Sequence, residues 1–246
     1  MEISELYKLF LQHPQVTTDS RDCPVGSIFF ALKGESFDGN KFAELAIDKG
    51  CSYAVVDEAE YAKHGDGRFI LVDDCLKALQ QMANYHRREL GTKIIGITGT
   101  NGKTTTKELV YTLRSEKYNV LCTLGNFNNE IGVPKTLLRL TKEHQLAVVE
   151  MGASHPGDIK SLVDIVEPDY GIITNVGRAH LQGFGSFEGV IKTKGELYDY
   201  LRTKPGSVVF IDDDNEHLRG ISHDLTLIKY GMAGREDLCA NGQVVS

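Results

Sequence analysis

The sequence predicts an α/β protein of two domains, over residues 1–90 and 91–246. Short apolar runs that read as strands alternate with amphipathic helical segments along most of the chain, which is typical of βαβ units on a mostly parallel sheet. A chain of 246 residues is long enough to bury two separate cores. Gly91 lies between the end of a helical segment and the start of a new strand, and we place the domain boundary there.

The first part of the chain reads as a small α/β domain. An apolar run over 26–32 precedes the turn-rich segment GESFDGN, and an amphipathic helix over 41–49 follows, ended by Gly50. The remaining predicted elements are strands at 52–57 and 68–73 and a helix at 75–90.

The second part has a stronger βαβ rhythm. Its predicted strands are 93–98, 118–123, 145–150, 170–174, 207–212 and 225–230, and its predicted helices include 103–115, 132–140 and one that starts near Phe187. Ligands of such parallel sheets bind outside the carboxyl ends of the strands. The sequence stops at Ser246 without a closing helix after these strands, so we expect this second domain to be incomplete.

Composition excludes several classes of protein. With 41% apolar and 25% charged residues, the chain is neither disordered nor collagen-like. A formal net charge of −7 argues against a nucleic-acid-binding surface. The five cysteines lack a C-x-x-C spacing, which suits a reducing compartment without disulfides or zinc. A signal peptide and a membrane-spanning apolar run are not readable, so we expect a cytoplasmic protein without membrane insertion.

The segment GITGTNGKTTT, residues 96–106, predicts a phosphate-binding loop between an apolar strand and a helix. Glycines let successive N–H groups converge on a phosphate, and the helix N-terminus adds partial positive charge. Lys103 can reach the terminal phosphates, and Thr104 offers a hydroxyl to Mg²⁺. The strict pattern G-x-x-x-x-G-K-[ST] would need glycine in place of Ile97, so a glycine turn with a solvated lysine is the alternative. The strand before the loop and the helix after it favour phosphate binding, with ATP as the nucleotide.

The motif TGTNGKTTT resembles the nucleotide loop of the Mur ligase and folylpolyglutamate synthetase superfamily, whose short loop accounts for Ile97. The resemblance covers essentially the whole chain, and four further segments are similar to the branch that adds D-Ala-D-Ala. These segments are TDSR at 18–21 with FFALKGESFDGNKF, GNFNNEIGVP at 125–134, EMGASHPG at 150–157 and TNVGRAHL at 174–181. The resemblance implies a UDP-precursor-binding N-terminal domain and a truncated, P-loop ATPase-like central domain.

The resemblance also implies which residues hold the nucleotide and magnesium. The implied ATP-binding residues are Gly99, Thr100, Asn101, Gly102, Lys103, Thr104, Thr105 and Asn129. The implied Mg²⁺ ligands are Thr104, Glu150, His180 and Lys194, with Lys103, His180 and Lys194 acting in catalysis. Glu150 and His180 follow predicted strands, where oxygen ligands suit a hard cation. From the residues alone, a solvated turn at Glu150 and a structural histidine at 180 are open alternatives.

Two further segments, residues 126–129 and the residues around His155, contain polar clusters. Asn126, Asn128 and Asn129 form a turn-prone run. This run resembles the family loop beside the γ-phosphate and the substrate carboxylate, and we choose Asn129 while leaving the assignment within the cluster open. His155 is interpreted as a turn or helix-entry residue, since the surrounding Ser and Asp suffice for capping.

In the first domain, Thr18, Asp19, Ser20 and Arg21 carry hydroxyls and a guanidinium suited to a diphosphate. On the residues alone a surface turn with a solvated arginine would be preferred, whereas the resemblance implies that they bind UDP. Asn40 is added as a substrate contact, although the family usually has histidine at this position.

Lys194 is expected to be carbamylated by CO₂ and to bridge metal ions as an anion. It shares the inward stripe of a predicted helix with Phe187, Val190, Ile191, Leu197, Tyr198 and Leu201. An interior position lowers the pKa of a lysine, and the neutral amine is the form that reacts with CO₂. The alternative is that the aliphatic part of the Lys194 side chain packs against the protein while its ammonium reaches water. The segment IKTKGEL resembles the family segment whose second lysine is carbamylated, and Lys192 and Glu196 are expected to be ordinary solvated positions.

The implied activity is that of an ADP-forming ligase of peptidoglycan precursor synthesis, which adds D-Ala-D-Ala to UDP-MurNAc-tripeptide through an acyl phosphate. Lys103 and Mg²⁺ would neutralise charge on the phosphoryl and carboxylate oxygens. One alternative is the related ligase that adds the third amino acid, and another is a non-catalytic fragment that binds the UDP precursor and ATP. We expect a monomer. We also expect these 246 residues to be inactive alone, because family members carry a third domain that closes over ATP.

Overall fold

The computed structural model describes residues 1–63, 65–178, 181–232 and 238–242. The chain divides into two compact units, Met1–Glu89 and Leu90–Ser246. Each unit contains a parallel β-sheet and helices, so the α/β prediction is confirmed. Among the described residues, no helix is both long and apolar enough to cross a membrane.

The first unit is built on a parallel sheet with the strand order β1-β2-β5-β6. Its strands are β1 (Val16–Thr17), β2 (Ile28–Phe30), β5 (Tyr53–Val56) and β6 (Phe69–Leu71), with an antiparallel pair of β3 (Lys33–Gly34) and β4 (Phe37–Asp38). Its helical segments are α1 (Ile3–Gln12), η1 (Gly39–Phe42), α2 (Ala43–Asp48), η2 (Ala59–Tyr61) and α3 (Cys75–Leu90). Every residue of β2 is buried, as an apolar run inside a parallel sheet requires.

Two elements of the first unit differ from the sequence prediction. Helix α1 was not predicted, although it buries Leu6 and Phe10 on one face and Glu2 and Glu5 form a capping box at its start. The helix predicted over 41–49 is divided into η1 and α2, because the Asp38 side chain accepts a hydrogen bond from the N–H of the second residue of η1 and starts a 3₁₀ turn there.

The second unit is built on a parallel sheet with the described strand order β13-β12-β11-β10-β7-β9-β8. Its strands are β7 (Lys93–Thr98), β8 (Val120–Cys122), β9 (Leu146–Glu150), β10 (Tyr170–Ile173), β11 (Val208–Asp212), β12 (Leu227–Met232) and β13 (Ala240–Gly242). Its helices are α4 (Lys103–Ser115), α5 (Gly132–Leu137), α6 (Asp158–Val166), α7 (Leu181–Phe184), α8 (Phe187–Thr203) and α9 (Glu216–Gly220).

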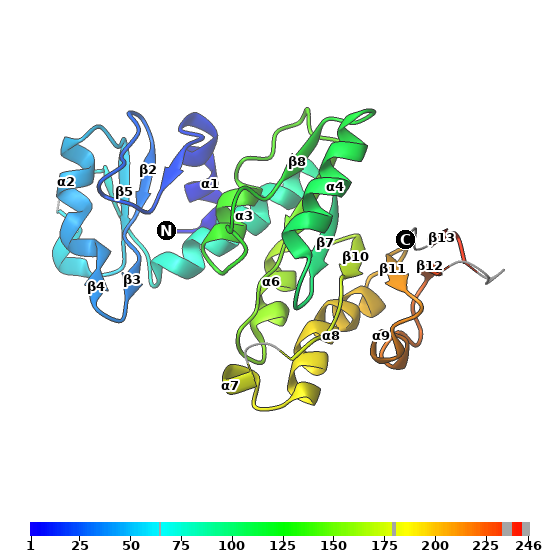
Figure 1. Ribbon diagram of the computed structural model, residues 1–246. Coiled ribbons are helices and arrows are strands. Elements are labelled where there is room, and N and C mark those ends of the chain that lie inside the picture. The colour runs from blue at the N-terminus through cyan, green and yellow to red at the C-terminus, as the bar shows by residue number, and fades with distance from the viewer. Residues whose placement is uncertain (64, 179–180, 233–237, 243–246) are drawn as a thin grey trace. The chain divides into compact units, whose positions relative to one another are not determined.

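Helices cover both faces of this second sheet (Figure 1). On one face, Ile95 and Ile97 of β7 belong to a core cluster against which Val110 and Tyr111 of α4 pack. On the other face, a Cβ added to Gly171 of β10 would meet Leu201 of α8 at 2.3 Å, so the helix lies directly on the strand. Side chains alternate between the faces of a strand, which is why one apolar run serves both layers.

The register of the central strands brings three strand ends to the same edge. Ile97 of β7 is opposite Glu150, the last residue of β9, and Thr98 is opposite Ile173, the last residue of β10. The segment that follows β7 therefore leaves the sheet beside Glu150 and the segment that follows Ile173. This edge is the carboxyl end of the sheet, where ligands of such folds bind.

Helix α8 buries most of the stripe that its periodicity predicts, including Val190, Lys194 and Leu197, while Phe187 and Ile191 are half-buried. The prediction that Glu196 is solvated was wrong. Its carboxylate accepts hydrogen bonds from the N–H groups of Gly157 at 2.9 Å and Lys160 at 2.7 Å. These groups belong to the start of α6, whose first N–H groups have no partner within the helix. A residue on the polar side of one helix thus caps its neighbour, which periodicity within a single helix could not indicate.

Asp169 ties the start of β7 to the start of β10 and the end of α8. Its carboxylate accepts hydrogen bonds from the Ile94 N–H at 3.0 Å and the Lys93 ammonium at 2.8 Å, and it pairs with Lys204 at 3.3 Å. Burial by itself would raise the pKa of this carboxyl. The hydrogen bonds from Lys93 and Ile94 and the positive charge of Lys204 outweigh burial and hold the pKa below its ordinary value.

Replacing Glu196 with Ala should lower the free energy of unfolding by about 1–2 kcal/mol, because two N–H groups at the start of α6 lose their acceptor. The measurement is urea unfolding followed by circular dichroism. Lys192→Ala, at an exposed position of the same helix, is the matched control and should change stability far less. Equal effects of the two substitutions would contradict the capping role.

Replacing Asp169 with Asn should cost about 1–3 kcal/mol of stability at pH 7, since a charged acceptor of several hydrogen bonds becomes neutral. Because the folded pKa is depressed, the carboxylate's contribution is present above the unfolded pKa of about 3.9 and is lost as the pH falls through the folded pKa. Unfolding curves of parent and variant should therefore converge in acid. A constant difference in stability across this acid range would show that the ionised carboxylate is not responsible.

Candidate functional site

The phosphate-type loop occupies residues 99–102, between the end of β7 and the start of α4. Gly99 has φ of +144°, and a Cβ there would meet Thr174 Oγ1 at 2.0 Å. Gly102 precedes α4 in the left-handed region, with φ of +76°, and no side chain among the described residues caps the helix at this position. Both glycines are therefore required by backbone geometry, and the N–H groups at the N-terminus of α4 can donate hydrogen bonds to a bound anion.

The segment after β10 holds this loop from the side. The Asn175 side chain accepts a hydrogen bond from Asn101 N at 3.0 Å, and its amide donates to Asn101 O at 3.1 Å. Thr174 Oγ1 donates to the same carbonyl at 2.6 Å, and Gly177 N donates to Thr100 Oγ1 at 2.9 Å. The motif TNVG at 174–177 is thus a clamp on the loop. The sequence offered only a family resemblance for this motif, because the contacts cross about 75 residues of chain.

Lys103 begins α4 and turns back over the loop. Its ammonium donates to Gly99 O at 3.0 Å and Thr100 O at 3.1 Å. The cation therefore lies above the loop between β7 and α4, where it can meet the outer oxygens of a phosphate. Thr104 and Thr105 follow on the exposed first turn of the helix.

Glu150 is 1% exposed, and one of its contacts is with the first turn of the helix that follows the loop. One carboxylate oxygen accepts a hydrogen bond from Thr104 Oγ1 at 3.0 Å, and the other accepts one from Asn128 Nδ2 at 2.8 Å. Its own N–H donates to Thr123 Oγ1 at 3.0 Å. A carboxylate and a hydroxyl at hydrogen-bonding distance are ligands that a hard divalent cation accepts.

The structure distinguishes the neighbouring asparagines. Asn129, chosen from the sequence, uses its Oδ1 to accept hydrogen bonds from Gly132 N at 2.8 Å and Ile131 N at 3.3 Å, and so caps the start of α5. Asn128 is the one that contacts Glu150. A Cβ on Gly152 would meet Asn128 Oδ1 at 2.9 Å, so glycine is needed there for the asparagine to keep this position.

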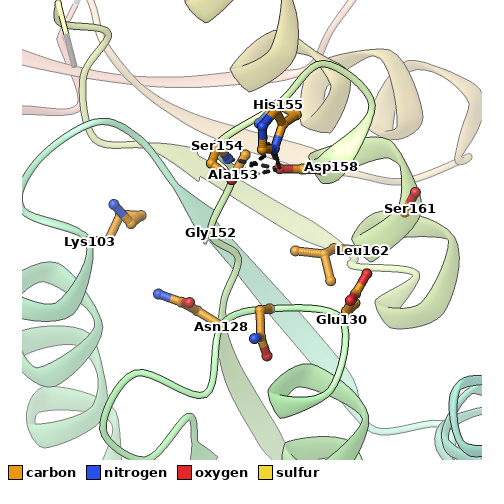
Figure 2. Close-up of a pocket in the computed structure, with 11 residues that line it drawn as sticks. Lys103, Asn128, Glu130, Gly152, Ala153, Ser154, His155, Asp158, Ser161 and Leu162 are labelled. Carbon is orange, nitrogen blue, oxygen red and sulfur yellow. Dashed lines mark hydrogen bonds and ion pairs between the residues drawn. The ribbon is translucent and has the colours of Figure 1, made fainter. Parts of the chain in front are cut away.

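A cavity of about 480 Å³ opens beside the loop. Figure 2 shows Lys103 at the left of this cavity, His155 and Asp158 at the top and Asn128 at the bottom. Asn129 also lines it. The Asp158 carboxylate accepts hydrogen bonds from the N–H groups of Ser154 and His155, both at 2.8 Å, so the interpretation of His155 as a helix-entry residue is confirmed.

Lys194 is 3% exposed and contacts Ala153, one of the residues that line this cavity. Its ammonium donates to Ala153 O at 3.4 Å and lies 5.4 Å from the centre of the Phe184 ring. Burial, and to a smaller extent the positive charge of Lys103, together lower the pKa of Lys194 to about 8. The buried position expected from the helical stripe is therefore confirmed, and the alternative of an ammonium that reaches water is wrong for this structure.

The side chains and backbone groups at this site have the chemistry needed to bind a nucleotide together with Mg²⁺. The loop supplies N–H groups and a cation for phosphates, while Thr104 and Glu150 supply two oxygen ligands of the kind that Mg²⁺ takes together with phosphate oxygens. Within the described ranges, no three His, Cys, Asp or Glu side chains gather as a metal-binding group. His180, expected as a further metal ligand, lies outside the described residues.

The candidate UDP residues form a compact turn in the first unit. The Arg21 guanidinium is bound by both oxygens of the Asp19 carboxylate, at 2.9 and 2.8 Å, and its side chain is 87% exposed. Thr18 is half-buried, and Ser20 is buried with its carbonyl accepting a hydrogen bond from Lys49 at 2.7 Å. The arginine and Thr18 are thus open to a ligand, whereas Asp19 and Ser20 shape the turn.

Asn40 does not fit the role of a direct substrate contact. It is 0% exposed, and its amide donates to Asp38 Oδ1 at 3.0 Å and to Asp57 Oδ1 at 2.9 Å. Its carbonyl oxygen accepts the Asp57 N–H at 3.0 Å. This expectation is corrected: Asn40 joins η1 to the end of β5, and its hydrogen-bonding groups are directed at the protein.

Comparison with known proteins covers both units. Residues 97–245 match the family described as Mur ligase middle domain, and residues 14–87 match the family described as Mur ligase family, catalytic domain. The UDP-N-acetylmuramoyl-tripeptide–D-alanyl-D-alanine ligase of Bacillus subtilis is 40% identical over 220 residues, 86% of this chain and 48% of that protein. The Escherichia coli ligase of the same name is 39% identical over 203 residues, 82% of this chain and 44% of that protein.

Solved structures agree with these sequence matches. A crystal structure of MurF from Acinetobacter baumannii has a TM-score of 0.81 and 37% identity, over 89% of this chain and 48% of that chain. MurF from Thermotoga maritima in complex with ADP has a TM-score of 0.81 and 32% identity, over 91% of this chain and 52% of that chain. The chain spans about half the length of the relatives it matches. Because the matches include both units and the phosphate-type loop that joins β7 to α4, the chain belongs to the Mur ligase family.

Proposed function

We propose that this chain is the part of an ATP-dependent amide ligase that binds the UDP precursor and ATP, and that the ligase adds D-alanyl-D-alanine to UDP-N-acetylmuramoyl-tripeptide in the cytoplasm. The observation that carries the proposal is the meeting of Lys103, Thr104 and Glu150 at one sheet edge, beside a cavity of about 480 Å³. The relatives that are 39–40% identical bear the name of this ligase.

In the proposed reaction the precursor carboxylate takes the γ-phosphoryl group of ATP to form an acyl phosphate, and ADP is the leaving group. The amine of D-Ala-D-Ala then attacks the acyl carbon, and the amide forms as inorganic phosphate leaves and the nitrogen loses a proton. Lys103 would hold the phosphoryl oxygens and neutralise the charge that develops on them. Glu150 and Thr104 would hold Mg²⁺, which supplies further positive charge when bound. Asn128 orients the Glu150 carboxylate through its 2.8 Å hydrogen bond. Asn129 lines the cavity in which the carboxylate and the phosphate would meet.

We assign Lys194 the role of a carbamate at the same site. The ammonium would first lose a proton to water, and the neutral amine would attack CO₂ at carbon. A C–N bond would form as one C–O π bond opens onto oxygen, and a second proton would pass from the nitrogen to water, so that the original cation is replaced by an anion. The buried position and the pKa of about 8 support this assignment, because a substantial neutral fraction exists near neutral pH. His180 is proposed as the neighbouring metal ligand.

In the first unit, Thr18 and Arg21 are proposed to bind the diphosphate of the UDP group, with Asp19 and Ser20 shaping the turn. The exposed guanidinium supports this role, since Arg binds phosphate oxygens through two parallel hydrogen bonds. A phosphate would compete with Asp19 for the same N–H groups.

A related ligase that adds the third amino acid is the second candidate, and a module that binds without turnover is the third. An amide-forming assay with UDP-MurNAc-tripeptide, ATP and D-Ala-D-Ala, scored by phosphate release, tests the proposal. The related ligase would instead join a single amino acid to the precursor that carries a dipeptide. Turnover with that pair of substrates only would indicate the related ligase. Binding of precursor and ATP without any turnover by the complete protein would indicate the binding module.

Replacing Lys103 with Ala should weaken ATP binding by roughly ten- to hundredfold, because a charge-assisted contact with the phosphates is lost. Isothermal titration of the chain with ATP and Mg²⁺ measures this change. Lys142→Ala, at an exposed lysine away from the loop, is the control and should bind ATP as the parent does. Equal affinity of the Lys103 variant and the parent would refute the assignment.

A carbamate on Lys194 should give a new carbonyl signal in ¹³C NMR when the protein is equilibrated with ¹³CO₂. At constant dissolved CO₂ the signal should grow as the pH rises toward about 8, since the neutral amine is the reactive form. Lys194→Met should remove the signal, while Lys192→Met, at the exposed lysine two residues away, should leave it unchanged. The same spectrum from parent and Lys194→Met would exclude the carbamate.

A further inference from the structure

Lys107 is a buried lysine one helical turn beyond Lys103, and the reaction outlined above does not use it. It is 0% exposed, although it lies on α4, whose other residues are exposed or half-buried. Its ammonium donates to Thr123 O at 2.7 Å and pairs with the Glu108 carboxylate at 2.7 Å. A buried ammonium is costly unless it is paired and hydrogen-bonded, so these contacts fix where it can lie.

Thr123 connects this lysine to the proposed metal-binding carboxylate. It follows β8, is 0% exposed, and its Oγ1 accepts the Glu150 N–H at 3.0 Å. The Glu150 side chain in turn accepts a hydrogen bond from Thr104 Oγ1 at 3.0 Å. Thr104 and Lys107 are three residues apart on the same helix and therefore share a face. Three hydrogen bonds therefore connect α4 to Thr123 after β8, Thr123 to Glu150 at the end of β9, and Glu150 back to α4.

We infer that Lys107 is a positioning residue that sets the placement of Glu150 through Thr123, and so tunes the binding of Mg²⁺ with the nucleotide. The inference rests on the proposed function of Glu150 as a magnesium ligand. Glu150 is held at its N–H by Thr123 and at its carboxylate by Thr104, so a shift of Thr123 moves the carboxylate relative to the phosphate loop. Partners of this kind, one step removed from a metal ligand, commonly alter metal affinity when they are changed.

The competing interpretation is that Lys107 only anchors α4 to the strand beside it. An anchor would affect stability and nucleotide binding irrespective of metal. A positioning residue would affect the Glu150 amide and the metal dependence of nucleotide binding specifically. Methionine at 107 would keep most of the side-chain volume while leaving the buried Thr123 carbonyl without its donor, so Lys107→Met separates the two interpretations.

The first measurement is amide hydrogen exchange of the chain without nucleotide. In Lys107→Met the Glu150 amide should exchange about tenfold faster than in the parent, while the Ile95 amide in the middle of β7 keeps its rate. Lys117→Met, an exposed lysine just after α4, is the matched control and should leave both rates unchanged. If Lys107→Met does not fold, Lys107→Gln, which is neutral and retains an N–H donor, is measured in the same way.

The second measurement is ADP binding at a series of Mg²⁺ concentrations. Lys107→Met should need about tenfold more Mg²⁺ for half-maximal tightening of ADP binding, with unchanged affinity in the absence of Mg²⁺. Thr123→Val, which removes the hydroxyl acceptor but keeps the shape, should reproduce both effects. Thr123→Ser, which keeps the hydroxyl, should behave as the parent.

Two results would overturn the inference: an unchanged Glu150 exchange rate in the folded Lys107 variant, or a loss of ADP affinity that is equal with and without Mg²⁺. A parent chain that binds no ADP at all would instead refute the proposed nucleotide function. The exchange experiment does not need nucleotide, so it still decides whether Lys107 controls Glu150.

Discussion

The parallel register of β7, β9 and β10 is the constraint on which the site depends. It brings Thr98, Glu150 and Ile173 to one edge of the sheet, although they are about 25 to 50 residues apart from one strand to the next. The loop after β7 can then be clamped by the segment after β10 and faced by the carboxylate that ends β9. A shift of one residue in this pairing would reverse the faces to which the side chains point and would separate these groups.

Around this edge the protein buries several charged groups, and each has specific partners. Glu150 is bound by a hydroxyl and an amide, Lys107 by a carbonyl and a carboxylate, and Lys194 by a carbonyl and an aromatic ring. Desolvation makes a charge expensive when its partner is lost, so these contacts restrict the side chains to few arrangements. Lys194 has the weakest described hydrogen bond of the three, at 3.4 Å, and its pKa shows the effect of burial.

The asparagine cluster shows how adjacent residues of one type acquire different roles. Asn129 accepts hydrogen bonds from the N–H groups at the start of α5, which is a local role that its sequence position favours. Asn128 points toward Glu150, 22 residues further along the chain, because the backbone of Gly152 leaves room for its amide. Asn40 and Glu196 likewise owe their roles to elements distant in sequence.

The sequence by itself determined the α/β class, most strand and helix positions, the phosphate-type loop and the burial of Lys194. These features follow from short-range patterns: alternation of apolar residues, glycines at a strand–helix junction, and a stripe along one helix. Only the tertiary structure decided that Asn128 contacts Glu150, that Asn40 is internal, that Glu196 caps α6 and that Lys107 is linked to Glu150. The reason is physical. Such contacts join residues on different elements, and their partners are set by sheet register and helix packing, which no single segment of the sequence contains.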